Sequence, residues 1–277
     1  LKGERNFMLT NPLPHLNLHQ ITNSGQCFRM KETSPNHFSI IAKDRYLELS
    51  QTGNSVCFDC TEEEFETFWK NYFDLDQDYG KYIQAINTND KYLTAAAAHG
   101  SGIRILRQDV WEMLISFLIS QQNNIVRIRR CIENISREYG EKKITKTGEE
   151  YYAFPAPETL AFAEEEALLK CNLGYRAKYV KGTAKSVLSG EIQLEKLGEM
   201  SYKKAKEELL KLYGVGEKVA DCICLFGLHK MEAFPIDTHI RQALDAHYKR
   251  GFPNRRYKGM QGIMQQYIFY YELTQHT

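Results

Sequence analysis

A short turn between two helical patterns constrains the fold of this chain more than any other feature. Gly214, Val215 and Gly216 separate SYKKAKEELLKLY from KVADCICLFGL, and both flanking segments have helical apolar spacing. Glycine takes the positive φ values that a tight reversal needs. We therefore expect a helix-hairpin-helix over about residues 201–228, with Ser201 as the first N-cap. Backbone N–H groups at the start of the second helix would bind phosphate, although the turn alone also fits a purely structural hairpin.

The first third of the chain has the pattern of a small antiparallel sheet. Alternating segments within residues 37–60 predict strands, with a turn at residues 52–54. A helix follows, because Thr61 and Glu64 form a capping box ahead of a run rich in aromatic residues. The strands precede every long helical segment.

From about residue 80 onward the spacing is helical, with short loops. The predicted helices span residues 81–89, 91–98, 109–122, 124–140, 157–170, 175–190, 201–213, 218–228, 237–248 and 262–275. We therefore expect an α+β fold with an antiparallel β-rich domain over residues 1–100 and a helical body over residues 101–277.

Composition excludes some classes of protein. No apolar run reaches 18 residues, so we expect no transmembrane helix. The net charge of +1 does not by itself indicate a nucleic-acid-binding protein. The charge is uneven, however, since residues 1–100 carry 9 Lys or Arg against 13 Asp or Glu and residues 201–277 carry 12 against 8. A basic face in the C-terminal third would fit this distribution.

The seven cysteines favour a reducing compartment over a disulfide framework, because their number is odd and several lie in apolar helical segments. Cys57 and Cys60 form a CxxC pair, but no second pair or nearby histidine completes a zinc site. We expect no metal-binding site of this kind.

Lys218 occupies an unusual position for a lysine. It falls in the first turn of the second hairpin helix, where the helix dipole disfavours a cation. Cys222 and Leu225 follow it on one face, and apolar neighbours also favour the neutral amine. A neutral amine has a free lone pair and is a plausible nucleophile. Most helical lysines are solvated surface residues, but that interpretation leaves this one, on an almost apolar helix, unexplained.

Asp237 lies in FPIDTHIRQAL, where Pro235 interrupts the chain and the aspartate is placed to cap the next helix. A carboxylate that accepts backbone N–H groups stays ionised. Such a cap can be purely structural. Combined with an activated lysine, it would stabilise a developing positive charge.

These segments together resemble the helix-hairpin-helix DNA glycosylases, and among them the 8-oxoguanine DNA glycosylases. The resemblance rests on GVGEKVADCICL followed by FPIDTH, and it extends in the family's order over nearly the whole chain. The other matching segments are SGQCFR at 24–29, ILRQD near residue 106, SQQNNIVRI at 120–128, LGYRAKYV at 173–180 and QGIMQQYIF at 261–269. The hairpin lysine and the aspartate mark the bifunctional branch, and the two terminal segments mark the 8-oxoguanine branch.

The resemblance implies an N-terminal sheet like that of TATA-binding proteins, followed by two helical subdomains with the active site between them. It also implies a reaction, in which Lys218 attacks C1′ of a damaged nucleotide, forms a Schiff base and permits β-elimination. Asp237 would stabilise the cationic sugar in the transition state. The four-cysteine iron–sulfur site of related enzymes has no counterpart near the C-terminus, and this chemistry needs no metal.

Recognition of the base is likewise implied by the resemblance. The backbone carbonyl of Gly25 would accept the N7 hydrogen that distinguishes 8-oxoguanine from guanine. The flipped base would lie between Cys222 and Phe269, and Gln265 would bind its Watson–Crick edge. Taken without the resemblance, Phe269 fits a core position and Gly25 a simple turn.

The remaining expected contacts are with DNA. Gln122 or Asn123, together with Tyr175, would fill the gap left by the flipped base, and Arg127 and Arg176 would contact the orphaned cytosine. The family commonly has asparagine where this chain has Gln122, so the plug and the preference for cytosine need a test. Phosphate contacts are expected from His239 and from the backbone of the hairpin, at Gly214, Gly216 and Val219.

The carbonyls of Leu210, Leu212 and Val215 would hold a structural monovalent cation, and no other cofactor is expected. We expect a monomer that binds duplex DNA, not a membrane, inside the cell. Two alternatives stay open at this point. One is a glycosylase for another lesion, such as an alkylated purine, and the other is a non-catalytic DNA-binding module.

Overall fold

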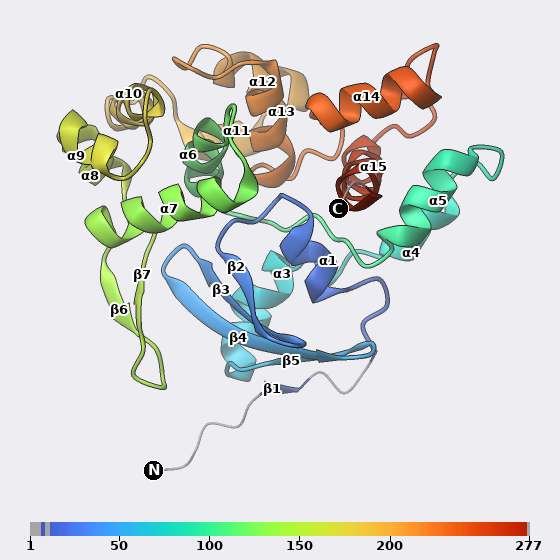
Figure 1. Cartoon of the computed structure of the whole chain (residues 1–277), viewed down its shortest axis with the longest axis horizontal. Coiled ribbons are helices and arrows are strands. Elements are labelled where there is room, and N and C mark those ends of the chain that lie inside the picture. Colours follow the sequence, from blue (N-terminus) through green and yellow to red (C-terminus); the bar gives the residue numbers. More distant parts are fainter. Residues whose placement is uncertain (1–6, 9–11, 276–277) are drawn as a thin grey trace. The chain divides into compact units, whose positions relative to one another are not determined.

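The computed structural model describes residues 7–8 and 12–275 (Figure 1). It divides into two compact units, each built from segments that are distant in sequence. Unit 1 comprises the described residues within Leu1–Ser39, Leu47–Arg107 and His229–Thr277, and unit 2 comprises Ile40–Tyr46 and Gln108–Leu228. Every helix in the described part of the chain is too short or too polar to span a lipid bilayer.

Five strands form one sheet in the order β1-β5-β4-β3-β2. The strands are β1 (Phe7–Met8), β2 (Met30–Ser34), β3 (His37–Ala42), β4 (Arg45–Thr52) and β5 (Ser55–Phe58). β5 pairs antiparallel with both β4 and β1. The predicted strands and the turn near residue 53 are confirmed, and Gly53 has the positive φ (58°) that this turn requires. β2 was not predicted, because four of its five residues are exposed and it lacks alternation.

The helical segment after the sheet begins with the predicted capping box. The Glu64 N–H donates to Thr61 Oγ1 at 3.1 Å, and the Thr61 N–H donates to Glu64 Oε2 at 3.1 Å. The helix is not regular, because a π-helical turn (η1, Phe65–Trp69) separates α2 (Glu62–Glu64) from α3 (Lys70–Tyr72).

Among the remaining helices of unit 1, the last described helix packs on a helix from the first 100 residues. They are α1 (Leu18–Asn23), α4 (Tyr79–Gln84), α5 (Lys91–His99), α14 (Thr238–His247) and α15 (Gln261–Gln275). α15, dark red in Figure 1, packs against α5 and α14. Residues 262–268 of α15 are all buried, so the helix is held firmly in place.

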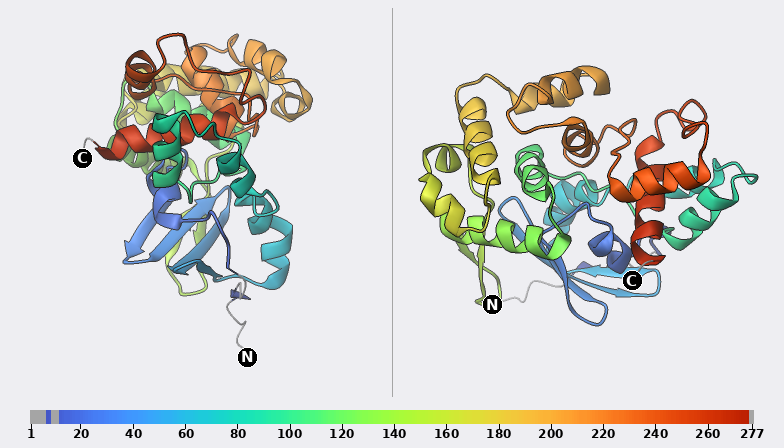
Figure 2. Two further views of the ribbon diagram at one scale, coloured as in Figure 1. Left: turned by 90° about the vertical axis from the view of Figure 1, so that its right-hand side faces the viewer. Right: turned by 45° about the horizontal axis from the view of Figure 1, so that its top comes forward.

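Unit 2 is built around α6 (Val110–Ser120), in which all residues from Trp111 to Ile119 are buried. Unit 2 also contains a small hairpin and seven further helices. They are α7 (Ile125–Tyr139), β6 (Lys142–Ile144), β7 (Glu150–Tyr152), α8 (Pro157–Phe162), α9 (Glu165–Lys170), α10 (Arg176–Leu188), α11 (Leu194–Glu199), α12 (Tyr202–Leu209) and α13 (Glu217–Phe226). α13, α10 and α7 pack on α6, and α10 packs on α8, as the right-hand view of Figure 2 shows in yellow.

The structure differs from the predicted elements at particular places. The helix expected over residues 157–170 is two helices, because Ala163 leaves the helical region with ψ at 139°. The β6–β7 hairpin and α11 were not predicted. The compact units also differ from a single boundary near residue 100, since α14 and α15 belong to the same unit as most of the sheet.

Candidate active site

The hairpin between α12 and α13 has the predicted turn, but only one of its two glycines has a positive φ. Gly214 has φ at +89°, whereas Gly216 is extended, with φ at −97°, and is the N-cap of α13. A Cβ on Gly214 would lie 2.4 Å from the Tyr179 ring, so the turn packs there without room for a side chain. Gly216 supplies no side-chain cap, which leaves the first N–H groups of α13, up to that of Val219, available to an anion.

Lys218 is half-buried at the start of α13 and points toward the end of α6. Its Nζ donates to Ser120 Oγ at 3.5 Å and lies 5.5 Å from the centre of the Phe117 ring. Ser120 Oγ in turn donates to the Phe117 carbonyl at 2.8 Å, so its lone pairs are left for the lysine. Cys222 follows one helical turn later and is 3% exposed. The nucleophile candidate is thus held between the start of one helix and the end of another.

A partly buried cluster around Asp221 fixes α13 against α12. Asp221 accepts hydrogen bonds from Tyr202 Oη at 2.6 Å and Lys206 Nζ at 3.0 Å, and Lys206 also pairs with Glu217. Burial raises the pKa of Asp221 although Tyr202 and Lys206 both favour its carboxylate. Asp221 therefore bonds to residues of α12, whereas Lys218 bonds to Ser120 of α6, although their spacing places both on one side of α13.

The turn after α6 separates the two candidates for filling the gap in DNA. Gln122 is exposed and has φ at +46°, whereas the Asn123 side chain donates to the Ile119 carbonyl at 3.1 Å. Arg176 is 3% exposed and donates to the carbonyls of Gln121 and Gln122, the latter at 2.9 Å. Arg176 therefore holds the turn in this structure, and Gln122 is the side chain that the turn presents to solvent.

Tyr175 and Arg127 are exposed on the same unit. The Tyr175 ring is 48% exposed and lies under the Arg176 guanidinium, 4.5 Å from its centre. It also meets Tyr179 edge to face at 5.8 Å. This support leaves the rim of a rigid aromatic side chain in solvent, as a wedge between bases requires.

On unit 1, Gly25 lies directly against Phe269. Gly25 has φ at +71°, and a Cβ placed on it would lie 2.9 Å from Phe269 Cε1. The adjacent Gln26 is fully buried, and its side chain bonds to Ser24 Oγ, the Arg104 carbonyl and the Leu106 N–H, each at 2.9 Å. Gln26 thus fixes the loop that presents the Gly25 backbone.

Gln265 and Phe269 lie one turn apart on α15, as predicted. Gln265 is 3% exposed, and its Nε2 donates to the Pro235 carbonyl at 3.0 Å. This bond fixes the side-chain amide, so Oε1 is the atom left to accept hydrogen bonds, at present from Gln266 Nε2 at 3.2 Å. The His239 ring meets Phe269 nearly at right angles, with centroids 6.0 Å apart.

Asp237 caps α14 as predicted, since its Oδ1 accepts from the Ile240 N–H at 2.8 Å. The segment that leads to it is held at three points. The Met231 carbonyl accepts from Gly262 N–H at 2.8 Å, the Pro235 carbonyl accepts from Gln265, and His229 lies in a polar network. Gly25, Gln265, Phe269, His239 and Asp237 all belong to unit 1, whereas Lys218 and Cys222 belong to unit 2.

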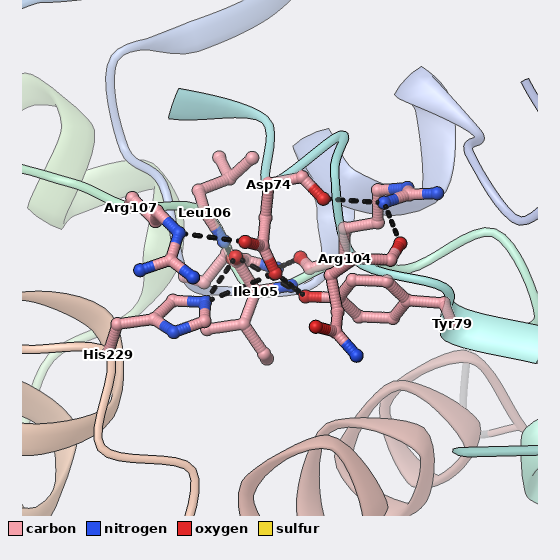
Figure 3. A network of polar contacts seen from close by, with 9 residues as sticks. Asp74, Tyr79, Arg104, Ile105, Leu106, Arg107 and His229 are labelled. Atoms are coloured by element: carbon pink, nitrogen blue, oxygen red, sulfur yellow. Dashed lines mark hydrogen bonds and ion pairs between the residues drawn. The ribbon is translucent and has the colours of Figure 1, made fainter. Parts of the chain in front are cut away.

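The polar network around Asp74 lies within unit 1 (Figure 3). The Asp74 carboxylate is 4% exposed and accepts from Arg107 Nε at 2.7 Å and Tyr79 Oη at 2.9 Å. His229 Nε2 lies 3.4 Å from Asp74 Oδ2 and 3.3 Å from the Ile105 carbonyl. Two acceptors around one ring nitrogen indicate that Nε2 carries a hydrogen. The network thus fixes the start of the segment that ends at Asp237.

Asp74 should make stability depend on acid pH. Burial favours its neutral form, but His229 and Arg107 outweigh burial and lower the pKa from 3.8 to about 2. The stabilisation is therefore present above pH 3.8, falls as the pH drops toward 2, and amounts to about 2 kcal/mol. We expect Asp74→Asn to lower the free energy of unfolding at pH 7 and to reduce its loss between pH 5 and pH 2. Urea unfolding at several pH values measures this, and equal pH dependence in both proteins would refute it.

Sequence reasoning missed the groups that support the candidate residues. Ser120 and Phe117 end a helix that is otherwise a buried apolar run, and nothing in their spacing pointed to Lys218. The Pro235 carbonyl is a backbone group, and the pairing of Asp74 with His229 spans 155 residues. Ser120 and Gln26 lie in the two segments, residues 120–128 and 24–29, that resemble the glycosylase family, and this resemblance is the feature that could have indicated them.

Comparisons with known proteins cover nearly the whole chain. Residues 8–114 match the family described as "8-oxoguanine DNA glycosylase, N-terminal domain", and residues 115–259 match "HhH-GPD superfamily base excision DNA repair protein". A probable N-glycosylase/DNA lyase of Methanothermobacter thermautotrophicus is 32% identical over 75% of this chain and 73% of that protein. The N-glycosylase/DNA lyase OGG1 of Arabidopsis thaliana is 32% identical over 79% of this chain, which spans 62% of that relative.

A solved structure is similar over the full length of both chains. It is the Clostridium acetobutylicum 8-oxoguanine glycosylase/lyase in complex with double-stranded DNA containing cytosine opposite 8-oxoguanine. The TM-score is 0.91 with 34% sequence identity, and 100% of each chain is covered. Both the sheet-containing unit and the helical hairpin therefore have counterparts in one known protein.

Proposed function

This chain belongs to the HhH-GPD superfamily of base excision DNA repair proteins and carries the N-terminal domain of 8-oxoguanine DNA glycosylases, and from this we propose that it excises 8-oxoguanine from duplex DNA and then cleaves the strand as a lyase. The protein is thus a bifunctional DNA glycosylase/lyase of base excision repair. It acts on DNA inside the cell, and its seven cysteines, none of which is in a disulfide among the described residues, are compatible with a reducing compartment.

The arrangement of Gly25, Gln265 and Phe269 is the main support for 8-oxoguanine as the substrate. Because the Gln265 Nε2 is bound to the Pro235 carbonyl, the amide presents its oxygen. An oxygen acceptor suits the N1–H and N2–H donors of a guanine-type edge and not the N1 acceptor of adenine. Gly25 brings backbone against the Phe269 ring with no side chain between them. A backbone carbonyl there would accept from N7–H of 8-oxoguanine and repel the N7 lone pair of guanine.

The chemistry follows from Lys218. Its lone pair attacks C1′ of the flipped nucleotide, and the electrons of the glycosidic bond leave with the base, which takes up a proton. Opening of the sugar ring gives an imine between Nζ and C1′. Removal of a C2′ proton then expels the 3′ phosphate and breaks the strand. Asp237 stabilises the positive charge that develops on the sugar as the base leaves.

The remaining roles concern DNA. Gln122 fills the gap in the stack, Tyr175 acts as the wedge, and Arg127 contacts the orphaned cytosine. Asn123 and Arg176 support this turn. His239 and the N–H groups of the hairpin bind phosphate, and Leu210, Leu212 and Val215 supply carbonyls for a monovalent cation. The Leu212 carbonyl accepts from Val215 N–H at 3.0 Å and retains a second lone pair for such an ion.

Excision assays on a panel of duplexes test the substrate. We expect release of 8-oxoguanine opposite cytosine and none from matched undamaged or 3-methyladenine-containing duplexes. Release of an alkylated purine without release of 8-oxoguanine would favour the alternative lesion class. Binding of all duplexes with no base release would favour a non-catalytic DNA-binding module.

Gly25→Ala is expected to weaken lesion recognition. The new Cβ would meet Phe269 Cε1 at 2.9 Å and would sit at φ +71°, which disfavours a side chain by about 1 kcal/mol. We expect excision to fall about 10-fold or more, from displacement of the ring that covers the base. Gly53→Ala is the control, because Gly53 also has positive φ (+58°) but has no neighbour within 4 Å of the added Cβ. Equal excision rates in the two variants would contradict the assignment of Gly25.

A further inference from the structure

The loop between α14 and α15 carries an unusual charge for this chain. Residues 248–260 contain five Lys or Arg and no Asp or Glu, in a chain whose net charge is only +1. All five side chains are exposed, and none forms an ion pair with another described residue. We call Lys249, Arg250, Arg255, Arg256 and Lys258 the basic loop. Many other lysines of the chain, such as Lys43, Lys143 and Lys206, do have acidic partners.

The basic loop is anchored rather than free. Phe252 is 8% exposed and packs on Phe234 at 4.7 Å and on Tyr257 at 5.5 Å between ring centroids. The Tyr257 hydroxyl accepts from the Asn87 N–H at 3.3 Å. Turn bonds of 2.8 Å from Asn254 N–H to the Phe252 carbonyl and 2.9 Å from Arg256 N–H to the Pro253 carbonyl shape the tip. Because its backbone is already ordered, the loop loses little conformational entropy when it binds a partner.

The basic loop connects α14, which Asp237 caps, to α15, which carries Gln265. α14 begins at Thr238, directly after Asp237, and its 10 residues place the loop about 15 Å from that end. At the other end, Gln261 bonds to the loop through the Gly259 N–H at 2.7 Å, and Gln265 follows one turn later, about 6 Å along α15. These lengths are less than one helical turn of duplex DNA, about 34 Å.

The exposed side chains of the basic loop suit contacts with phosphate and do not suit stacking on bases. Of its three aromatic residues, Phe252 and Tyr257 are buried, and Tyr248 is half-buried with its ring against Phe252 and its hydroxyl bonded to Asp90. No fully exposed ring is therefore available to stack on an unpaired base. Its exposed groups are cations on long flexible stems, which suit phosphates and give no sequence preference.

We infer that the basic loop binds backbone phosphates of the duplex to one side of the lesion, a contact that adds affinity and takes no part in base release. The inference rests on the proposed function, because DNA is the partner that Asp237 and Gln265 would engage from the same unit. The basic loop would thus contact the duplex at phosphates other than those bound by the hairpin.

The test uses the full chain with Arg255→Gln, Arg256→Gln and Lys258→Gln combined, which leaves the buried anchors in place. The control combines Lys31→Gln, Lys81→Gln and Lys196→Gln, which removes three exposed charges elsewhere on the described surface. Affinity for an undamaged duplex of about two helical turns is measured across a salt series. We expect the loop variant to bind about 10-fold or more weakly at low salt and its slope of log K against log salt to be shallower by about 2 to 3, since each lost phosphate contact removes about one.

The rate of 8-oxoguanine excision at saturating enzyme is measured in parallel and is expected to be unchanged in the loop variant. Salt slopes that match between the loop variant and the control would overturn the inference. So would a reduced excision rate with unchanged affinity. Failure of the wild-type protein to excise 8-oxoguanine would instead contradict the proposed function, and the salt slopes on undamaged DNA would still report on the loop.

Discussion

Lys218→Gln is expected to abolish excision of 8-oxoguanine while leaving lesion binding nearly intact. Glutamine keeps an uncharged N–H donor on the side of α13 that faces Ser120 Oγ, which accepts from Lys218 Nζ at 3.5 Å in the native protein. It has no nucleophilic amine, so neither C1′ attack nor imine formation can occur. We expect the single-turnover rate to fall by about 10⁴-fold or more, as measured with excess enzyme and a labelled duplex.

Lys211→Gln is the matched control for this experiment. It removes a lysine from the same hairpin, but Lys211 is exposed and pairs with Glu208 at 2.7 Å. We expect its excision rate to stay close to that of the native protein. Full activity in Lys218→Gln would overturn the assignment of the nucleophile, whatever the control shows.

Asp237→Asn is expected to slow base release by about 10²- to 10³-fold with little change in binding. Asparagine caps a helix as well as aspartate does, so the bond to the Ile240 N–H, 2.8 Å in the native protein, can be kept. Only the negative charge that would stabilise the cationic sugar is lost. Single-turnover rates and dissociation constants for the same duplex separate the two effects.

Asp78→Asn provides the control for the loss of charge at a cap. Asp78 caps α4 within the same unit by accepting from Gly80 N–H at 2.9 Å, and it has no assigned part in the reaction. We expect this variant to excise at the native rate. If Asp237→Asn loses affinity in proportion to its rate, then Asp237 acts in binding and not in stabilising the transition state.

The sequence predicted well those features that depend on local patterns. The capping box of Thr61 and Glu64, the cap at Asp237 and the hairpin near Gly214 each rest on a few adjacent residues, and all are present. The spacing of Gln265 and Phe269 placed them correctly on one helix. The resemblance to 8-oxoguanine glycosylases is confirmed by the family matches and by the solved structure of similar fold.

The features that the sequence could not predict depend on contacts between distant segments. No local pattern indicates that Gln265 gives its N–H to the Pro235 carbonyl, or that Arg176 holds Gln121 and Gln122. The break at Ala163 was missed because the apolar spacing continues across it. The Gly216 conformation was also missed, since glycine permits both the expected positive φ and the extended form observed.

Borohydride trapping detects the imine that Lys218 would form with the damaged nucleotide. The protein is incubated with a duplex that contains 8-oxoguanine opposite cytosine, beside an identical undamaged duplex, and the imine is reduced to a stable amine. We expect a covalent protein–DNA adduct with the damaged duplex only, located at Lys218 by mass spectrometry of the digested adduct and missing in Lys218→Gln. An adduct at another residue, or base release with no adduct at all, would contradict it.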